Sequence, residues 1–244
     1  MRPRIAIPVP HSGDPEYAAR ALPQYENAIQ QAGGDPVSIP LDHPAAEVKK
    51  LAERCDAVLL PGSRADVDPE KYRAGRDPKT ADADYPRDIV DGILLEDAYA
   101  SRKPVLGICY GLQILNVYRA GSLVQHIQSP VNHEAGRKVE VAHTVAIDSG
   151  SLLAQIVAGA KADPSGLPVN SSHHQSAENV GAGLKISARC PEDGIIEALE
   201  STDPDHFVLA VQWHPERSVD AASKAIFEAL VQAAKNKPIR EPKA

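Results

Sequence analysis

A cysteine between two glycines, at the end of a short apolar run, is the first feature of this chain that points to chemistry. Cys109 follows the run 104–106 and lies two residues after Gly107 and two before Gly111. This spacing is typical of a nucleophile elbow, a tight strand-to-helix turn that exposes the central side chain. The glycines permit the turn, and the N-terminus of the following helix favours a thiolate. The alternative is that Cys109 is a small buried hydrophobe.

A second motif supplies a base for such a thiol. The apolar run 207–211 has the pattern of a buried strand, and His214 and Glu216 follow just beyond it. In extended geometry, positions two apart point the same way, so the carboxylate can fix the tautomer of the imidazole. A cysteine, with a histidine held by an acid, is the arrangement used for thiol acyl transfer. We predict a catalytic triad of Cys109, His214 and Glu216, although a lone histidine after a strand is more often structural.

These motifs resemble those of the class I glutamine amidotransferase superfamily. Other segments are similar to its stand-alone branch, the gamma-glutamyl hydrolases, including those that act on gamma-glutamyl-gamma-aminobutyrate. The segments that carry the resemblance are 25–34, 59–63, 66–69, 87–88, 107–113, 120–123, 170–175, 191–194 and 212–216. The similarity runs from the first predicted strand to about residue 232. It implies a flavodoxin-like, doubly wound fold and cleavage of a gamma-glutamyl amide.

The resemblance also implies an oxyanion hole. One donor would be the backbone N–H of Tyr110, and the other would come from the Gly62–Ser63 loop. Amide hydrolysis needs such donors, and the loss of one typically costs on the order of a hundredfold in rate. The alternative for Gly62 is that it only turns the chain after a strand. Tyr110 stands where the hydrolase branch commonly has arginine, which leaves the preference for a leaving group open.

Substrate contacts are implied by the resemblance as well. Gln113, one helical turn after the nucleophile, would contact the gamma-glutamyl group, and Ser172, His173 and His174 would line the pocket. The adjacent histidines raise the question of a metal. However, consecutive side chains diverge, and the cysteines match no zinc spacing. We expect no metal and no organic cofactor, because nucleophile and base suffice.

The elements expected along the chain alternate between strand and helix. We predict strands at 4–9, 36–39, 57–60, 105–108 and 207–211, and helices at 18–32, 48–52, 88–100, 112–118 and 220–234. Short half-exposed strands are expected at 139–147, 184–188 and 195–199. The pattern predicts an α/β fold with a mostly parallel sheet flanked by helices, and extra short antiparallel strands in the second half. In such sheets, ligands bind beyond the carboxyl ends of the strands.

Length, composition and net charge limit the possible domain organisation and the possible binding partners. We expect a single domain over 1–234 and a polar tail over 235–244, with residues 64–86 as a loop beside the site. A net charge of −7 and 4% aromatic residues argue against nucleic acid. No apolar run is long enough to span a membrane, and the odd count of three cysteines suits the reducing cytoplasm. A homodimer is left open.

The sequence therefore predicts a thiol-dependent hydrolase of a small gamma-glutamyl compound, such as gamma-glutamyl-gamma-aminobutyrate, that acts through a thioester. The first alternative is a glutaminase subunit that delivers ammonia to a synthetase partner. The second is a ligand-binding or regulatory protein on the same scaffold, against which the complete triad argues.

Overall fold

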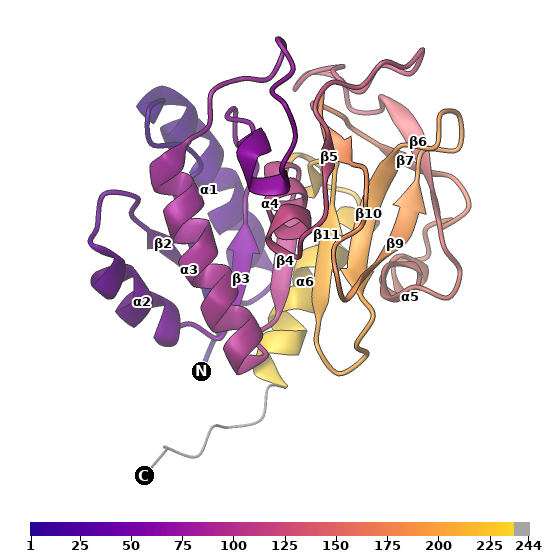
Figure 1. Cartoon of the computed structure of the whole chain (residues 1–244). Helices are drawn as coiled ribbons and strands as arrows, with labels where there is room; N and C mark the ends of the chain where they lie inside the picture. Colours follow the sequence, from indigo (N-terminus) through magenta and orange to yellow (C-terminus); the bar gives the residue numbers. More distant parts are fainter. Residues whose placement is uncertain (237–244) are drawn as a thin grey trace.

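A nine-stranded mixed sheet forms the centre of residues 1–236, the part of the chain that the computed structural model describes (Figure 1). Five neighbouring strands run parallel, in the order β2 (Asp35–Ile39), β1 (Arg4–Pro8), β3 (Ala57–Leu60), β4 (Val105–Ile108) and β11 (Val208–Val211). The sheet continues with antiparallel strands β10 (Ile196–Ser201), β9 (Leu184–Arg189), β6 (His143–Ile147) and β7 (Leu167–Val169). A separate two-stranded ribbon pairs β5 (Leu123–Val124) with β8 (Ser176–Ala177).

Helices cover both faces of the sheet (Figure 1). One apolar core lies under α1 (Pro15–Gln31), α5 (Leu152–Gly159) and α6 (Ala221–Lys235). The other lies under α2 (Ala45–Glu53), α3 (Tyr85–Ser101) and α4 (Tyr110–Tyr118). Two single turns, η1 (Pro69–Tyr72) and η2 (Pro215–Arg217), complete the elements. The predicted fold class, a doubly wound and mostly parallel sheet with short antiparallel strands in the second half, is confirmed.

Aspartate caps explain why two helices begin earlier than their apolar periodicity predicts. The side chain of Asp14 accepts a hydrogen bond from the Tyr17 N–H, and that of Asp84 accepts from the Arg87 N–H. Each cap stabilises its first turn by about 1 kcal/mol. As a result α1 and α3 each start three residues before the first residue of the predicted helix.

The second half departs from prediction in several places. The strand expected at 139–147 begins only at His143, and the short helix α5, capped by Ser151, was not predicted. The loop 64–86 contains the turn η1. The predicted tail 235–244 falls largely on residues 237–244, outside the described part of the chain; residue 235 ends α6.

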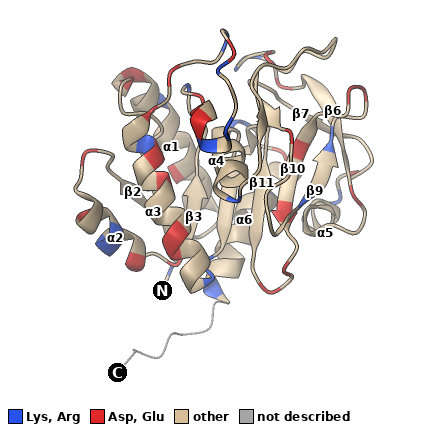
Figure 2. Cartoon of the chain, viewed as in Figure 1, with Lys and Arg blue, Asp and Glu red and all other residues tan. Residues whose placement is uncertain are grey.

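Acidic and basic residues are interspersed over the helices and loops in Figure 2. Within residues 1–236, no helix combines the length and the apolar character needed to cross a membrane.

Two glycines let α4 pack closely against the sheet. A Cβ atom on Gly111 would lie 2.1 Å from the carbonyl oxygen of Leu60 in β3, and one on Gly107 would lie 2.7 Å from the Gly111 carbonyl oxygen. Both distances are far below van der Waals contact, so only glycine fits. The close passage fixes where α4 begins, and hence where the residue before it lies.

We predict that Gly111→Ala lowers the free energy of unfolding by roughly 1–3 kcal/mol, because the added methyl group meets backbone rather than a movable side chain. The matched control is Gly92→Ala in α3, where a Cβ meets nothing within 4 Å. That substitution should raise stability by about 0.5–1 kcal/mol. Equal effects of the two in urea unfolding would refute the close-packing explanation.

Candidate active site

Cys109 occupies a strained turn between β4 and α4. Its backbone has φ 54° and ψ −106°, in the left-handed region that residues with side chains rarely adopt. Its N–H donates to the carbonyl oxygen of Val211 at 2.8 Å, which ties the turn to β11. Such strain costs about 1–3 kcal/mol and is found most often at functional sites. The strand, turn and helix have the geometry of a nucleophile elbow.

A short ion pair orients His214, which follows the neighbouring strand β11. The Nδ1 atom of His214 lies 2.7 Å from Oε1 of Glu216, and both side chains are only 2% exposed. The backbone of His214 is held by Asn170, which accepts from its N–H at 3.0 Å and donates to its carbonyl at 2.8 Å. Asn170 is a positioning residue that the motif reasoning did not single out. With Nδ1 on the carboxylate, Nε2 is left to accept a proton.

Burial sets the protonation states of the three groups. It raises the pKa of the Cys109 thiol to about 12, and the nearby charge of Arg217 offsets this only in part. Burial also lowers the pKa of His214, despite the adjacent Glu216. Burial opposes ionisation of Glu216, but His214 and Arg217 outweigh it and lower its pKa. In the resting site, burial therefore favours a neutral thiol and a neutral imidazole. Burial thus works against the thiolate that the helix N-terminus favours.

A cavity of about 300 Å³ brings most of the predicted residues together. The predicted site residues on its wall are Ser63, Cys109, Gln113, Ser172, His173, His174 and His214. Gly62 lies between the nucleophile and the base: a Cβ there would be 3.0 Å from Cε1 of His214 and 3.6 Å from Cβ of Cys109. The side chain of Glu216, only 2% exposed, is not part of the cavity wall.

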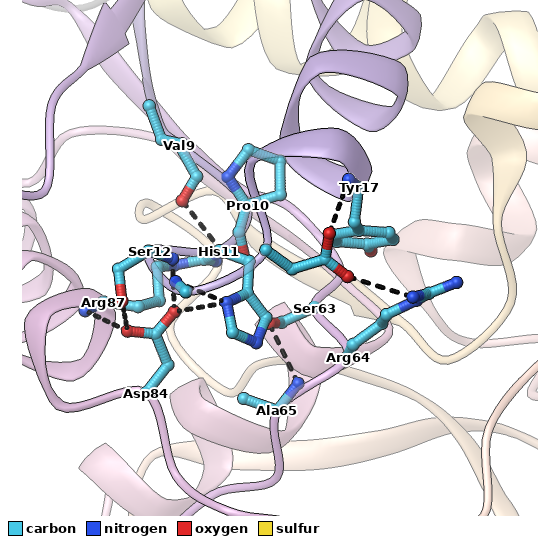
Figure 3. A network of polar contacts seen from close by, with 12 residues as sticks. Val9, Pro10, His11, Ser12, Tyr17, Ser63, Arg64, Ala65, Asp84 and Arg87 are labelled. Atoms are coloured by element: carbon cyan, nitrogen blue, oxygen red, sulfur yellow. Dashed lines mark hydrogen bonds and ion pairs between the residues drawn. The ribbon is translucent and has the colours of Figure 1, made fainter.

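The two candidate oxyanion segments differ in how their groups are used. The N–H of Gly62 donates to the Tyr25 hydroxyl at 3.1 Å, and the Ser63 hydroxyl accepts from the Ala65 N–H at 3.2 Å (Figure 3). The Tyr110 side chain is buried away from the cavity wall, where its hydroxyl donates to Asp88 at 2.8 Å. The Tyr110 side chain is therefore not the group that the predicted oxyanion role would use.

Three of the predicted substrate-binding residues make polar contacts that show how they face the cavity. Gln113 donates through Nε2 to the Gln175 carbonyl at 3.1 Å, at the cavity wall. His174 pairs with Asp66 at 3.0 Å, and the hydrogen bond that it donates to that carboxylate raises the pKa of His174. His173 touches the cavity but is buried, with its Nε2 directed into the interior.

Sequence reasoning missed four arginines that line the cavity together with the acids Asp66 and Glu134. They are Arg20, Arg64, Arg137 and Arg217. Burial, Arg217 and Arg20 together lower the pKa of Arg137, which shows that these cations crowd one another. No local pattern marks them, because they come from α1, two loops and η2. The cavity is thus suited to carboxylate groups.

A buried arginine supports the loop that follows β3. The guanidinium of Arg87 pairs with Asp91 at 2.8 Å and donates to the carbonyls of Pro10 and Pro61 at 2.9 and 2.8 Å. Next to it, Asp84 accepts from the N–H of Ser12 at 2.7 Å and contacts His11 (Figure 3). This network joins the segments after β1 and β3, and so holds Gly62 and Ser63 at the cavity.

Comparison with known proteins places this geometry in a family. Residues 9–216 match the family described as Peptidase C26. The chain belongs to this family. It is 35% identical over 224 residues to gamma-glutamyl-gamma-aminobutyrate hydrolase PuuD of Escherichia coli K12, covering 86% of this chain and 84% of that protein. It is 32% identical over 216 residues to protein NtpR of Enterococcus hirae, covering 85% and 87%.

The fold of this family member is shared with a glutaminase domain. The glutaminase domain of Trypanosoma brucei CTP synthase, solved with bound acivicin, superposes with a TM-score of 0.62 at 19% identity, over 98% of this chain and 96% of that one. Together, the family match, the relative PuuD and this shared fold confirm the resemblance inferred from the motifs: the chain is a glutamine amidotransferase-like hydrolase of the C26 family.

We predict that alkylation of Cys109 by iodoacetamide slows as pH falls through the pKa of His214, which lies below 6.5. Protonated His214 cannot accept the thiol proton, whereas neutral His214 can, so the rate should level off above that pKa. A background of Cys55→Ala and Cys190→Ala confines the signal to one thiol. A rate that keeps rising about tenfold per pH unit above pH 6.5, as for an unassisted thiol, would contradict this role of His214 as general base.

Proposed function

We propose that this C26 hydrolase cleaves the gamma-glutamyl amide bond of a small gamma-glutamyl compound, with Cys109 as nucleophile. The observation that carries the proposal is the meeting of the Cys109 elbow and the Glu216-oriented His214 at one cavity. A neutral thiol beside a neutral imidazole is a general-base pair that is ready to react when a carbonyl carbon is presented.

The reaction follows from these protonation states. As the sulfur of Cys109 attacks the gamma-carbonyl carbon, Nε2 of His214 takes the thiol proton, and Glu216 stabilises the imidazolium. His214 then gives that proton to the leaving nitrogen, the C–N bond breaks, and a gamma-glutamyl thioester remains. Water, deprotonated by His214, attacks the thioester, releases glutamate and restores the thiol. Nucleophile, acid and base are all supplied by the chain's own residues.

The oxyanion is assigned to two backbone donors. One is the N–H of Tyr110, the first residue of α4, where the helix dipole also favours negative charge. The N–H of Gly62 is engaged by the Tyr25 hydroxyl, so we assign the second donor to the N–H of Ser63. Arg87 holds this loop in place, because its guanidinium donates a hydrogen bond to the Pro61 carbonyl oxygen.

The charges of the cavity favour a substrate with more than one carboxylate. Gamma-glutamyl-gamma-aminobutyrate carries a carboxylate at each end and one ammonium group, whereas glutamine carries a single carboxylate. Arg64 pairs with Asp14 and Arg217 pairs with Glu216, so we assign the substrate carboxylates to Arg20 and Arg137. Asp66 or Glu134 would bind the ammonium group. The relative PuuD, which is named for this substrate, supports the same choice.

We propose that the reaction takes place in the reducing cytoplasm. We also propose that the chain acts without a synthetase partner. All three cysteines are free thiols, and a catalytic thiol must stay reduced to react. No metal or organic cofactor is needed for the acyl transfer itself. The glutaminase alternative becomes the preferred function if activity depends on a partner.

We predict that the purified chain alone releases glutamate from gamma-glutamyl-gamma-aminobutyrate faster than from glutamine, and that Cys109→Ala reduces this release to background. Cys55→Ala, at a buried thiol away from the cavity, should retain full activity. Activity that survives in Cys109→Ala would refute the mechanism. Slow turnover that rises sharply when a synthetase is added would instead identify the chain as a glutaminase subunit.

We predict that Arg137→Gln raises the KM for gamma-glutamyl-gamma-aminobutyrate by about tenfold or more with little change in kcat, because it removes a charged contact that substrate and transition state share. Arg54→Gln, on an exposed residue at the end of α2, is the matched control. Unchanged KM in Arg137→Gln would remove this residue from carboxylate binding.

A further inference from the structure

A second cluster of reactive side chains lies beneath the cavity and plays no part in the mechanism above. It comprises His133, His143, His173 and Glu197, all buried, whose ligand-type atoms lie within 4.8 Å of one another. The residues come from the segment after β5, from β6, from the loop after β7 and from β10. Figure 2 shows acidic positions on β10, which lies inside the sheet.

The four groups converge on one point without hydrogen bonding. Oε1 of Glu197 lies 3.2 Å from Nδ1 of His133, 3.4 Å from Nε2 of His143 and 3.6 Å from Nε2 of His173. The four side chains are at most 2% exposed. Within residues 1–236, these three nitrogens and both carboxylate oxygens have no hydrogen-bond partner. Orphaned buried polar atoms are costly, and five of them in one cluster call for a ligand.

The other ring nitrogen of each histidine already makes a hydrogen bond to a protein oxygen. The contacts are His133 Nε2 to Asp193 at 2.8 Å, His173 Nδ1 to the Gln175 carbonyl at 2.9 Å, and His143 Nδ1 to the Thr144 carbonyl at 3.2 Å. Carboxylate and carbonyl oxygens only accept, so these nitrogens carry the protons. In neutral rings, the inward nitrogens then present lone pairs toward a carboxylate, which is repulsive unless a cation lies between them.

This arrangement is the one in which protein ligands hold zinc. Metal-binding histidines donate their other N–H to a carboxylate or a backbone carbonyl, which fixes the tautomer. Zinc accepts imidazole nitrogen and carboxylate oxygen tetrahedrally at about 2.0–2.1 Å, which makes neighbouring ligands roughly 3.3–3.4 Å apart. The three separations from Oε1 of Glu197, 3.2, 3.4 and 3.6 Å, are close to these values, and all the ligand-type atoms lie within 4.8 Å of one another. Calcium and magnesium prefer all-oxygen sites.

We propose that His133, His143, His173 and Glu197 bind one zinc ion in a closed structural site. Four protein ligands complete a tetrahedron and leave no position for water, and the site is buried; both features characterise structural rather than catalytic zinc. The ion ties three segments to β10.

Two of these segments form the cavity wall. His133 precedes Glu134 and Arg137, and His173 lies between Ser172 and His174, all of which line the cavity. Zinc therefore fixes the wall that faces substrate, while the acyl-transfer chemistry stays with Cys109 and His214. The four ligands come from distant positions, which is why no zinc spacing is visible along the chain.

The test is the zinc content of the tag-free full chain, grown with added zinc and dialysed, measured by inductively coupled plasma mass spectrometry. The proposal predicts about one zinc per chain, and the same in Cys109→Ala, which excludes metal held by the catalytic thiol. Glu197→Gln and His143→Gln should lose it. The matched control is His206→Gln, at a buried histidine outside the cluster that bonds the Lys103 carbonyl, and it should keep its zinc.

A second measurement keeps the proposal testable if the variants fail to fold. Wild-type chain stripped with a chelator should show a lower Tm, restored by zinc and not by magnesium. Cobalt added instead should give the visible absorption of a tetrahedral centre. Wild-type chain that retains no zinc and whose Tm does not respond to it would overturn the proposal and leave protons on the histidines as the counter-charge to Glu197. Full retention of zinc in folded Glu197→Gln would also overturn it.

Discussion

The close approach of α4 to β3 is the constraint on which the site depends. Gly111 lies so near the Leu60 carbonyl oxygen that no side chain fits, and Gly107 in β4 allows a similarly close approach of the Gly111 backbone. This packing forces Cys109 into its left-handed turn at the carboxyl end of β4. Because β3, β4 and β11 are neighbours in the sheet, the segments that follow them meet at one edge. Gly62, Cys109 and His214 are brought together by that adjacency.

Burial then decides the chemistry that this meeting allows. A buried thiol and a buried imidazole both favour their neutral forms. The charged groups of the site are Glu216, which is paired with His214, and the arginines, which face the cavity. The reaction we propose therefore separates charge only when a substrate carbonyl is in place. The arginines attract an anionic substrate before that step, so binding and chemistry draw on different residues.

Local patterns predicted much of this arrangement. The spacing around Cys109 and the pair His214 and Glu216 are short-range features, and the alternation of strand and helix predicted the parallel half of the sheet. What depends on distant contacts was not visible. Asn170 reaches His214 across the fold, and the arginines converge from unrelated segments. α5 was missed because its eight residues are too few for a clear periodicity.

The adjacent histidines His173 and His174 show what the sequence could predict and what it could not. Their side chains were expected to diverge, and they do: His174 pairs with Asp66 at the cavity, whereas His173 turns inward to Glu197. The inward partners could not be read from sequence, because His133, His143 and Glu197 have no fixed spacing from His173.

The central claim is that the gamma-glutamyl group passes through Cys109. It is tested most directly by acid-quenching the enzyme during turnover of gamma-glutamyl-gamma-aminobutyrate and measuring the mass of the intact chain. The account predicts a species heavier by one gamma-glutamyl group, lost on treatment with hydroxylamine, absent in Cys109→Ala, and mapped to the peptide that contains Cys109. Its accumulation on any other residue, or burst kinetics with an unmodified Cys109, would contradict the account.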